Sequence, residues 1–211
     1  MIFSRQFADI SSNNSHFDAA TYRHGGHILI AIKATEGTNY TNPYHRGWSL
    51  QAGGNWVSVV HFHFARPDLG KDPEREAAHF LSVALPLAGW WDYLALDIER
   101  ATPFGWSHDP LWTLAFDDYV RAHSRFRIIL YANRSTLESY HGWLGSDRKR
   151  VWDADWSNAP DYAPPGYECV FRQFTDGVFG PEPHSMPGIG QCDVNRMSRG
   201  MFAQLTKRYR P

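Results

Sequence analysis

Short apolar runs alternate with amphipathic segments through about residue 143 of the chain. The runs are rich in aliphatic, aromatic and β-branched residues, a pattern typical of buried strands. They predict strands at 5–10, 28–34, 56–64, 93–99 and 126–132. The segments between them carry helical spacing, so the sequence predicts a series of βα units.

Two of the intervening helices have clear start signals. Asp72-Pro73 and Asp109-Pro110 each place an Asp at the N-cap and a Pro at the first helical position. The first of these helices has apolar residues at i, i+3, i+4, i+7 and i+8, which predicts one buried face. These residues are Ala77, Phe80, Leu81, Ala84 and Leu85.

The pattern changes after residue 145. Strand-like runs at 150–155, 168–174 and 190–195 are separated by loops rich in Pro and Gly, with no convincing helix. The chain from Arg196 onward is polar and basic, and we expect a surface helix or a frayed end there. These features predict an α/β fold: an irregular TIM-like barrel of about five βα units followed by three strands without regular helices.

Length and composition narrow the class of protein. The chain has 211 residues, and we expect 1–211 to form a single catalytic barrel domain with 196–211 as a basic C-terminal tail. A formal net charge of −1 leaves no global basic field, so we expect no nucleic-acid partner. No apolar run approaches the ~20 residues of a membrane-spanning helix, so we expect no membrane insertion. Two cysteines, Cys169 and Cys192, are too few for a disulfide scaffold, and the sequence leaves their pairing open.

Acidic residues stand where the predicted strands end. Strand ends from distant parts of a sequence converge on one face of a parallel barrel, so these acids predict an active site there. The acids are Asp9, Glu36, Asp97, Glu99, Asp155 and Asp193.

The sequence Asp97-Ile98-Glu99 is the strongest of these signals. Residues i and i+2 of a strand point to the same face, so the two carboxyl groups face one way. In a partly desolvated cleft one of the two pKa values should rise, which leaves a proton donor beside a carboxylate. Cleavage of a glycosidic bond requires this pair: an acid for the leaving oxygen and an anion for the oxocarbenium-like centre.

A series of short motifs makes the chain recognisable. In order, they are Asp9-Ile10-Ser11, Ile32-Lys33-Ala34-Thr35-Glu36-Gly37, Phe62-His63-Phe64-Ala65-Arg66-Pro67, Leu96-Asp97-Ile98-Glu99, Trp152-x-Ala154-x-Trp156, Gln173-Phe174-Thr175 and Pro187-Gly188-Ile189 leading to Asp193-x-Asn195. With these motifs the chain resembles the glycoside hydrolase family 25 lysozymes, the Chalaropsis-type muramidases common among phage endolysins and bacterial autolysins. The resemblance spans roughly residues 7–196.

The resemblance implies hydrolysis of the β-1,4 bond between N-acetylmuramic acid and N-acetylglucosamine in peptidoglycan, without a cofactor. It implies that Glu99 is the general acid/base and that Asp97 holds the substrate's 2-acetamido group or stabilises the positive intermediate. Asp9 and Asp193 would line the same acidic cleft. The family fold implied is an irregular barrel of five βα units and three strands.

Further substrate contacts are expected from strand ends around the cleft. The residues are Glu36, His63, Tyr131, Trp156 and Gln173. The chain departs from the family pattern at three positions, where Phe62, Trp156 and Phe174 stand in place of a more usual Tyr. Each departure removes a phenol hydroxyl that could bond to sugar, which puts the substrate preference in question but not the reaction.

Two other functions remain open at this stage. His61-x-His63 could supply two metal ligands on one strand face of a metal-dependent amidohydrolase, with Asp193 as a third ligand. A barrel that binds cell-wall glycan without cutting it is the second alternative, although binding alone needs no proton donor at Glu99.

The N-terminal segment bears on where the protein is made and where it acts. The N-terminal segment lacks a long apolar stretch followed by a small-residue cleavage site, so we expect no signal peptide. The protein would then be made in the cytoplasm and act on the cell wall after release, by a holin or another route that needs no signal. We expect a monomer whose partner is the peptidoglycan glycan strand.

Overall fold

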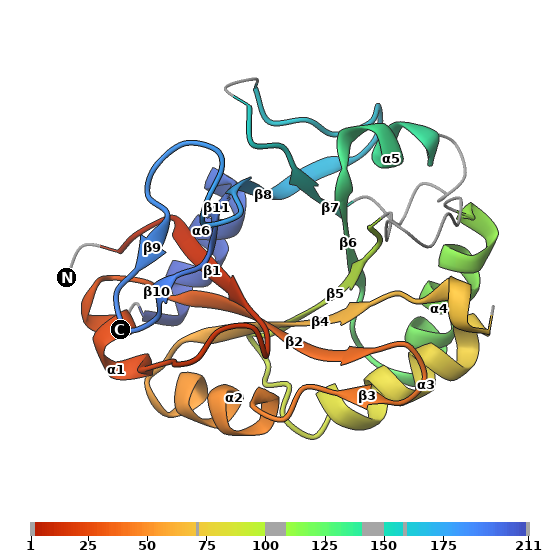
Figure 1. Cartoon of the computed structure of the whole chain (residues 1–211), viewed down its shortest axis with the longest axis horizontal. Coiled ribbons are helices and arrows are strands. Elements are labelled where there is room, and N and C mark those ends of the chain that lie inside the picture. Colours follow the sequence, from red (N-terminus) through yellow and green to blue (C-terminus); the bar gives the residue numbers. More distant parts are fainter. Residues whose placement is uncertain (1–2, 71, 100–108, 141–149, 158–159, 210–211) are drawn as a thin grey trace.

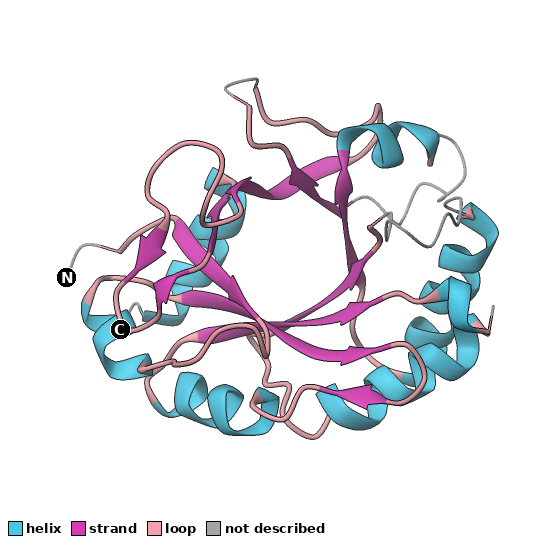
Figure 2. Ribbon diagram, in the orientation of Figure 1, coloured by secondary structure: helices cyan, strands magenta, loops and turns pink. Residues whose placement is uncertain are grey.

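A sheet that closes on itself forms the centre of the computed structural model (Figures 1 and 2). The structure describes residues 3–70, 72–99, 109–140, 150–157 and 160–209. The strands in spatial order are β1 (Gln6–Ile10), β11 (Asp193–Met197), β8 (Glu168–Thr175), β7 (Arg150–Ala154), β6 (Ile128–Asn133), β5 (Tyr93–Asp97), β4 (Ser58–Phe64), β2 (Leu29–Glu36) and β3 (Tyr40–Thr41). A parallel pairing of β1 with β2 closes the ring. The short strand β3 lies outside the ring and pairs antiparallel with the end of β2.

Helices follow the first strands and surround them on the outside (Figure 2). They are α1 (Ala19–His24), α2 (His45–Gly54), α3 (Pro73–Ala84), α4 (Pro110–His123) and α5 (Arg134–Ser139), with a short 3-10 helix at Pro67–Leu69. The start signals act as expected: Asp72 accepts a hydrogen bond from the Arg75 amide and Asp109 from the Leu111 amide. The predicted barrel of five βα units followed by three strands is confirmed.

The direction of the last strand differs from a fully parallel barrel. β11 runs antiparallel to both β1 and β8, and a small hairpin of β9 (Ser185–Met186) and β10 (Gly190–Gln191) precedes it. Asp193 therefore stands at the start of its strand and not at the end. Because the strand is reversed, this start lies beside Asp9, the paired residue of β1. Asp193 therefore lies on the expected face of the barrel, but it does so at the start of a reversed strand and not at the end of a parallel one.

The C-terminal tail is a packed helix. Helix α6 (Arg199–Thr206) and a 3-10 turn at Lys207–Tyr209 follow β11, while Arg196 still belongs to that strand. Met201 and Leu205 of α6 are buried among side chains of the barrel interior. The expected helix is present, but its inner face seals the barrel, so a frayed end is excluded for these residues.

Alternation along β4 decides which side chains can reach a cleft. Phe62 packs among the barrel-interior residues, whereas His63 packs against Phe80 and Phe116 of the helix layer. His61 likewise faces outward, where it contacts His45 of α2. Successive strand residues point to opposite faces, so the phenylalanines of β4 point into the barrel and its histidines point toward the helices outside it.

Candidate active site

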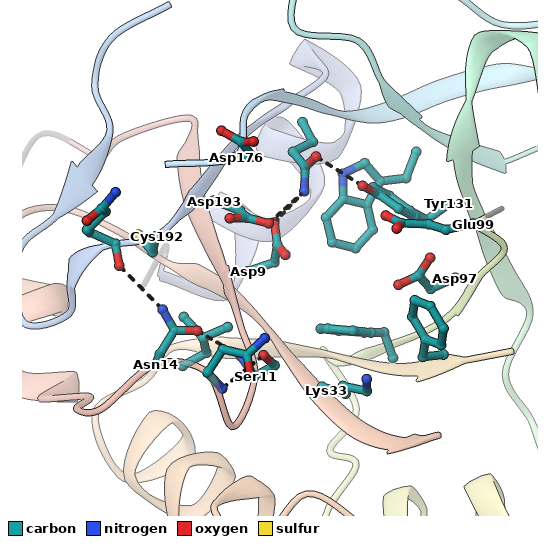
Figure 3. A pocket seen from close by; sticks show the side chains of 17 residues that line it. Asp9, Ser11, Asn14, Lys33, Asp97, Glu99, Tyr131, Asp176, Cys192 and Asp193 are labelled. Atoms are coloured by element: carbon teal, nitrogen blue, oxygen red, sulfur yellow. Dashed lines mark hydrogen bonds between the residues drawn. The ribbon is translucent and has the colours of Figure 1, made fainter. Parts of the chain in front are cut away.

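A cleft of about 440 Å³ opens where the parallel strands end (Figure 3). The side chains that line it come from the eight strands of the barrel, from β10 and from the loops between them. The lining residues are Asp9, Ile10, Ser11, Asn13, Asn14, Lys33, Phe62, Phe64, Asp97, Glu99, Tyr131, Trp152, Gln173, Asp176, Gln191, Cys192 and Asp193. The four acids predicted to be catalytic are brought together in this one cavity.

Asp9 and Asp193 form a carboxyl pair on one side of the cleft (Figure 3). The Gln173 amide nitrogen donates to Asp9 Oδ2 and to Asp193 Oδ2, each at 3.2 Å. Asn195 Nδ2 also donates to Asp9 Oδ2 at 2.7 Å. These donors fix the positions of both carboxyl groups.

Gln173 joins the carboxyl pair to the aromatic side of the cleft. Its Oε1 accepts hydrogen bonds from the Tyr131 hydroxyl and from Trp156 Nε1, both at 3.0 Å. Its Nε2 donates to the two aspartates, so both donors and both acceptor positions of the amide are used. The network therefore determines the orientation of the Gln173 side chain.

Burial sets the protonation of the carboxyl pair. It raises the pKa of Asp9 to about 6, against the opposing effect of hydrogen bonds from Asn195 and Gln173. Burial, followed by the negative charge of Asp9, raises the pKa of Asp193 to about 9. A hydrogen bond between the two carboxyl groups adds to this difference. Near neutral pH we expect Asp193 to hold a proton and Asp9 to be an anion.

Asp97 and Glu99 face this pair from the other side of the cleft (Figure 3). Asp97 is 8% exposed, and burial followed by the charge of Glu99 raises its pKa well above the usual 3.8. Its Oδ1 has no hydrogen-bond partner among the described residues. Glu99 is more open to solvent, yet desolvation by the surrounding protein still raises its pKa. The pKa values of both carboxyl groups are raised, whereas the sequence predicted that only one of them would rise. The assignment of the proton donor to one member of the pair stays a prediction.

Lys33 is a cleft residue that the sequence did not single out for the site. Its Nζ lies 4.5 Å from the centre of the Phe64 ring and 2.6 Å from Glu36 Oε2. Its positive charge favours the ionised forms of Asp97 and Glu99, against the larger effect of burial. The clue in the sequence was its position on β2, two residues beyond a strand residue that faces the interior.

The carboxyl pair predicts a pH-dependent stability. Asp193 keeps its proton up to about pH 9 when folded, but releases it near 3.8 when unfolded. The contribution of that proton to stability is complete below 3.8 and declines as pH rises toward 9. The free energy of unfolding should therefore fall more steeply between about pH 7 and pH 9 in the wild type than in Asp193→Asn, as measured by urea denaturation.

Asp155→Asn is the matched control for this experiment. The pKa of Asp155 is lowered: burial opposes the shift, but hydrogen bonds from Ser157 and the nearby arginines outweigh it. This group does not titrate between pH 7 and 9, so its removal should leave the slope unchanged. Equal slopes for the wild type and Asp193→Asn would contradict the protonated pair.

Two of the strand-end acids lie outside the cleft. Glu36 lines an adjoining groove, where it pairs with Lys33 and with Arg66 Nη1 at 2.8 Å. Asp155 is on the outer side of β7 and contacts Arg134 at 3.0 Å and Arg172 at 3.5 Å. Asp155 follows the outward-facing Asp153, whereas Trp152 faces the cleft, so the expectation that Asp155 joins the site is wrong.

His63 is likewise misplaced as a substrate contact. It is fully buried, its Nδ1 lies 2.8 Å from Thr35 Oγ1, and its Nε2 lies 2.8 Å from Glu76 Oε2. His61 Nδ1 lies 2.8 Å from His45 Nε2. Both histidines point away from the cleft and into the layer between sheet and helices, so they cannot form a metal site with Asp193. The amidohydrolase alternative is not favoured.

The three departures from the family's tyrosines have different consequences. Phe62 lines the cleft, so a hydroxyl is missing there. Trp156 is 42% exposed and reaches Gln173, so its indole supplies a donor at the rim. Phe174 packs among buried residues that include Ile10 and Val194, outside the cleft lining. Its lost hydroxyl therefore does not bear on substrate.

The two cysteines are both free thiols. Cys169 lies in β8, while Cys192 lines the cleft just before Asp193. Burial raises the pKa of each to about 12, which keeps both thiols protonated. Neither is a nucleophile at neutral pH.

Comparisons with known proteins agree with this geometry. The chain matches the sequence profile described as glycosyl hydrolases family 25 over residues 8–181. It is 30% identical over 150 residues to an N,O-diacetylmuramidase from a Chalaropsis species, covering 64% of this chain and 68% of that protein. Its fold is similar to a bacterial lysozyme from Streptomyces coelicolor, with a TM-score of 0.77, 22% identity and 95% of each chain covered. A muramidase from Acremonium alcalophilum gives a TM-score of 0.74 at 21% identity, over 95% of this chain and 97% of that one.

A closed α/β barrel whose strand ends bring several carboxyl groups into one cleft defines a class of carboxylate-dependent hydrolases. Within that class, the chain belongs to family 25 of the glycosyl hydrolases, as the match over most of its length shows. The predicted resemblance and the prediction of a glycoside hydrolase are both confirmed.

Proposed function

We propose that this enzyme cleaves the β-1,4 bond between N-acetylmuramic acid and N-acetylglucosamine in peptidoglycan by carboxylate acid/base catalysis. The observation that carries the proposal is the convergence of Asp9, Asp97, Glu99 and Asp193 in one cleft, each with a raised pKa. Elevated carboxyl pKa values near a sugar-sized cleft are what protonation of a glycosidic oxygen requires. The Chalaropsis relative is an N,O-diacetylmuramidase, which supports the choice of substrate.

Glu99 is the general acid/base in this proposal. It is the most solvent-accessible of the four acids, so a glycosidic oxygen can approach it, and its raised pKa favours the protonated form that delivers a proton to the leaving group. After the bond breaks, the resulting carboxylate can accept a proton from the attacking water. Both steps use the same carboxyl group in its two protonation states.

Asp97 acts on the sugar ring or its 2-acetamido group. Its buried Oδ1 has no partner among the described residues, so it can accept a hydrogen bond from an acetamido N–H. Alternatively its negative charge stabilises the positive centre at the sugar carbon. Asp9 and Asp193 hold one proton between them and complete the acidic wall of the cleft.

Tyr131, Gln173 and Trp156 are proposed as substrate contacts. Tyr131 and Gln173 are buried residues that line the cleft, whereas Trp156 is exposed. Trp156→Ala removes an exposed indole that can pack on a sugar face and a donor to Gln173 Oε1. We expect KM for peptidoglycan fragments to rise roughly ten-fold, while kcat changes less, because one aromatic contact to substrate is lost. Steady-state kinetics check this, with Trp90→Ala as the exposed-tryptophan control. An unchanged KM would remove Trp156 from the substrate site.

A glycan-binding barrel without activity is the remaining competitor. Binding alone needs neither raised carboxyl pKa values nor a protonated partner pair, so the cleft chemistry disfavours it. The test is release of reducing ends from purified peptidoglycan, with and without EDTA. We expect release that is insensitive to EDTA. Retention of the protein on peptidoglycan without any release would favour the binding barrel, and release of free peptide amines that EDTA prevents would favour the amidohydrolase.

The enzyme's working state is part of the same proposal. We propose that the enzyme acts as a monomer on the glycan strands of the cell wall. No helix in the described part of the chain is long and apolar enough to cross a membrane. Light scattering of the purified protein checks the monomer, and a dimer mass would overturn it.

A further inference from the structure

Two tryptophans are strongly exposed at the end of the barrel opposite the cleft. Trp56 is 61% exposed and Trp90 is 80% exposed. They lie in the loops that lead into β4 and β5, and these strands pair in parallel with Val60 beside Tyr93. The two loops are therefore neighbours at the end where the parallel strands begin. Apolar side chains that gather on one exposed surface, unlike ones scattered singly, often mark an interaction site.

Arginines stack on these aromatic rings. The Arg208 guanidinium lies 5.4 Å from the Trp56 ring centre, and the Arg125 guanidinium lies 5.8 Å from that of Trp90. Arg23 lies 5.1 Å from the ring centre of Tyr209, the residue that follows Arg208. We call these six residues the Trp–Arg face: Arg23, Trp56, Trp90, Arg125, Arg208 and Tyr209.

The charge of this end contrasts with that of the whole chain. The formal net charge is −1, so no global positive field exists to hold the protein on an anionic surface. The acids of the cleft lie at the other end, while exposed Arg127 and Lys207 extend the positive charge beside the Trp–Arg face. Two acids also lie at this end of the barrel. The oxygens of Asp92 accept hydrogen bonds from the amides of Val59 and Gly89, and exposed Glu168 lies 3.9 Å from Arg150. The acids of the cleft and the basic residues of the Trp–Arg face therefore lie at opposite ends of the barrel.

We propose that the Trp–Arg face docks on the surface of an anionic phospholipid bilayer, a role beyond the proposed hydrolysis. Indole rings prefer the boundary between headgroups and acyl chains, and guanidinium groups pair with lipid phosphates. A soluble polyanion would use the arginines but would leave the exposed indoles in water. Docking of this kind is interfacial and needs no spanning helix. It would hold the cleft away from the bilayer, facing glycan that lies beyond it.

Co-sedimentation with vesicles tests the proposal on the intact protein. One set of vesicles contains phosphatidylglycerol mixed with phosphatidylcholine, and the other contains phosphatidylcholine alone. We expect partition onto the anionic vesicles only, weakened by salt. Arg125→Gln and Lys207→Gln should each reduce the partition coefficient roughly five-fold, because each basic side chain near an anionic bilayer contributes a factor of that order.

Matched variants separate this face from the rest of the surface. Trp90→Ala should weaken vesicle binding, whereas Phe179→Ala, with a ring 66% exposed in the loop after β8, should not. Arg46→Gln on α2 is the corresponding charge control. All variants should cleave short soluble glycan fragments at the wild-type rate, which shows that they are folded. Because binding is measured without substrate, its result is independent of the proposed function.

The proposal fails if the protein ignores anionic vesicles at low salt, or binds both kinds of vesicle equally. It also fails if Trp90→Ala and Arg125→Gln bind as the wild type does. Loss of binding to purified peptidoglycan in these variants, without any binding to vesicles, would assign the face to glycan.

Discussion

Replacement of Glu99 by Gln is expected to lower kcat on peptidoglycan roughly a thousand-fold. The amide side chain would keep the size and hydrogen-bonding capacity of the glutamate but could not transfer a proton. Binding of glycan depends on the remaining cleft residues, so the affinity should change little. In the wild type, kcat should fall as pH rises through the raised pKa of Glu99, because the acid form is the one that protonates the leaving oxygen.

Glu168→Gln is the matched control for this variant. Glu168 is 55% exposed at the start of β8, at the end of the barrel away from the cleft. The same chemical change there should leave kcat within about two-fold. If Glu99→Gln retained more than about a tenth of the wild-type kcat, the proton donor would have to be sought among the other three acids.

Replacement of Asp97 by Asn should separate activity from stability. The variant loses a carboxyl group that can become negative as positive charge develops at the reacting centre, so kcat is expected to fall roughly a hundred-fold. The same change should raise the melting temperature at neutral pH. Burial raises the pKa of Asp97, so its ionised form is disfavoured in the folded protein, and Asn carries no such cost. Thermal unfolding and kinetics on one preparation measure both effects.

Asp155→Asn is the control for Asp97→Asn. Asp155 also follows a barrel strand, but it pairs with Arg134 and Arg172 on the outer side. Its loss should therefore lower the melting temperature and leave kcat close to wild type, the reverse of the pattern for Asp97. A drop in both quantities for Asp97→Asn would mean that this carboxyl group is structural.

Local signals were sufficient to predict the barrel. The caps at Asp72 and Asp109 marked the starts of two helices, and the apolar runs marked the strands. Both signals lie within a few neighbouring residues of the sequence. The reversed β11 was not predictable in this way. Its direction follows from pairing with β1 and β8, which are distant in sequence, and a short strand has the same pattern in either direction.

The correct and the incorrect predictions of site residues differ in whether the face of the strand was considered. Asp97 and Glu99 were correctly assigned to one face because the two-residue period was counted within one segment. His63 and Asp155 were assigned to the cleft from their place at a strand end, without asking which face they occupy. Neighbouring Phe62 and Trp152 have the opposite parity and line the cavity.

Glu36 shows a third kind of difference between sequence and structure. The pairing of β2 with β4 shifts register between Lys33 and Thr35, so the regular alternation of side chains is interrupted there. Regular alternation would place Lys33 and Thr35 on one face, but Lys33 reaches the cleft while Thr35 Oγ1 lies 2.8 Å from Nδ1 of the outward-facing His63. Glu36, the next residue, lines the adjoining groove and pairs with Arg66. Such an irregularity depends on the partner strand, and the sequence of β2 alone does not disclose it.

Mass spectrometry of the fragments released from purified peptidoglycan tests the central claim most directly. Cleavage of the β-1,4 bond on the muramic acid side leaves fragments whose reducing end is N-acetylmuramic acid. The cleft described above predicts these fragments, together with their loss in Glu99→Gln. Fragments that end in reducing N-acetylglucosamine, or peptides freed from intact glycan, would contradict it.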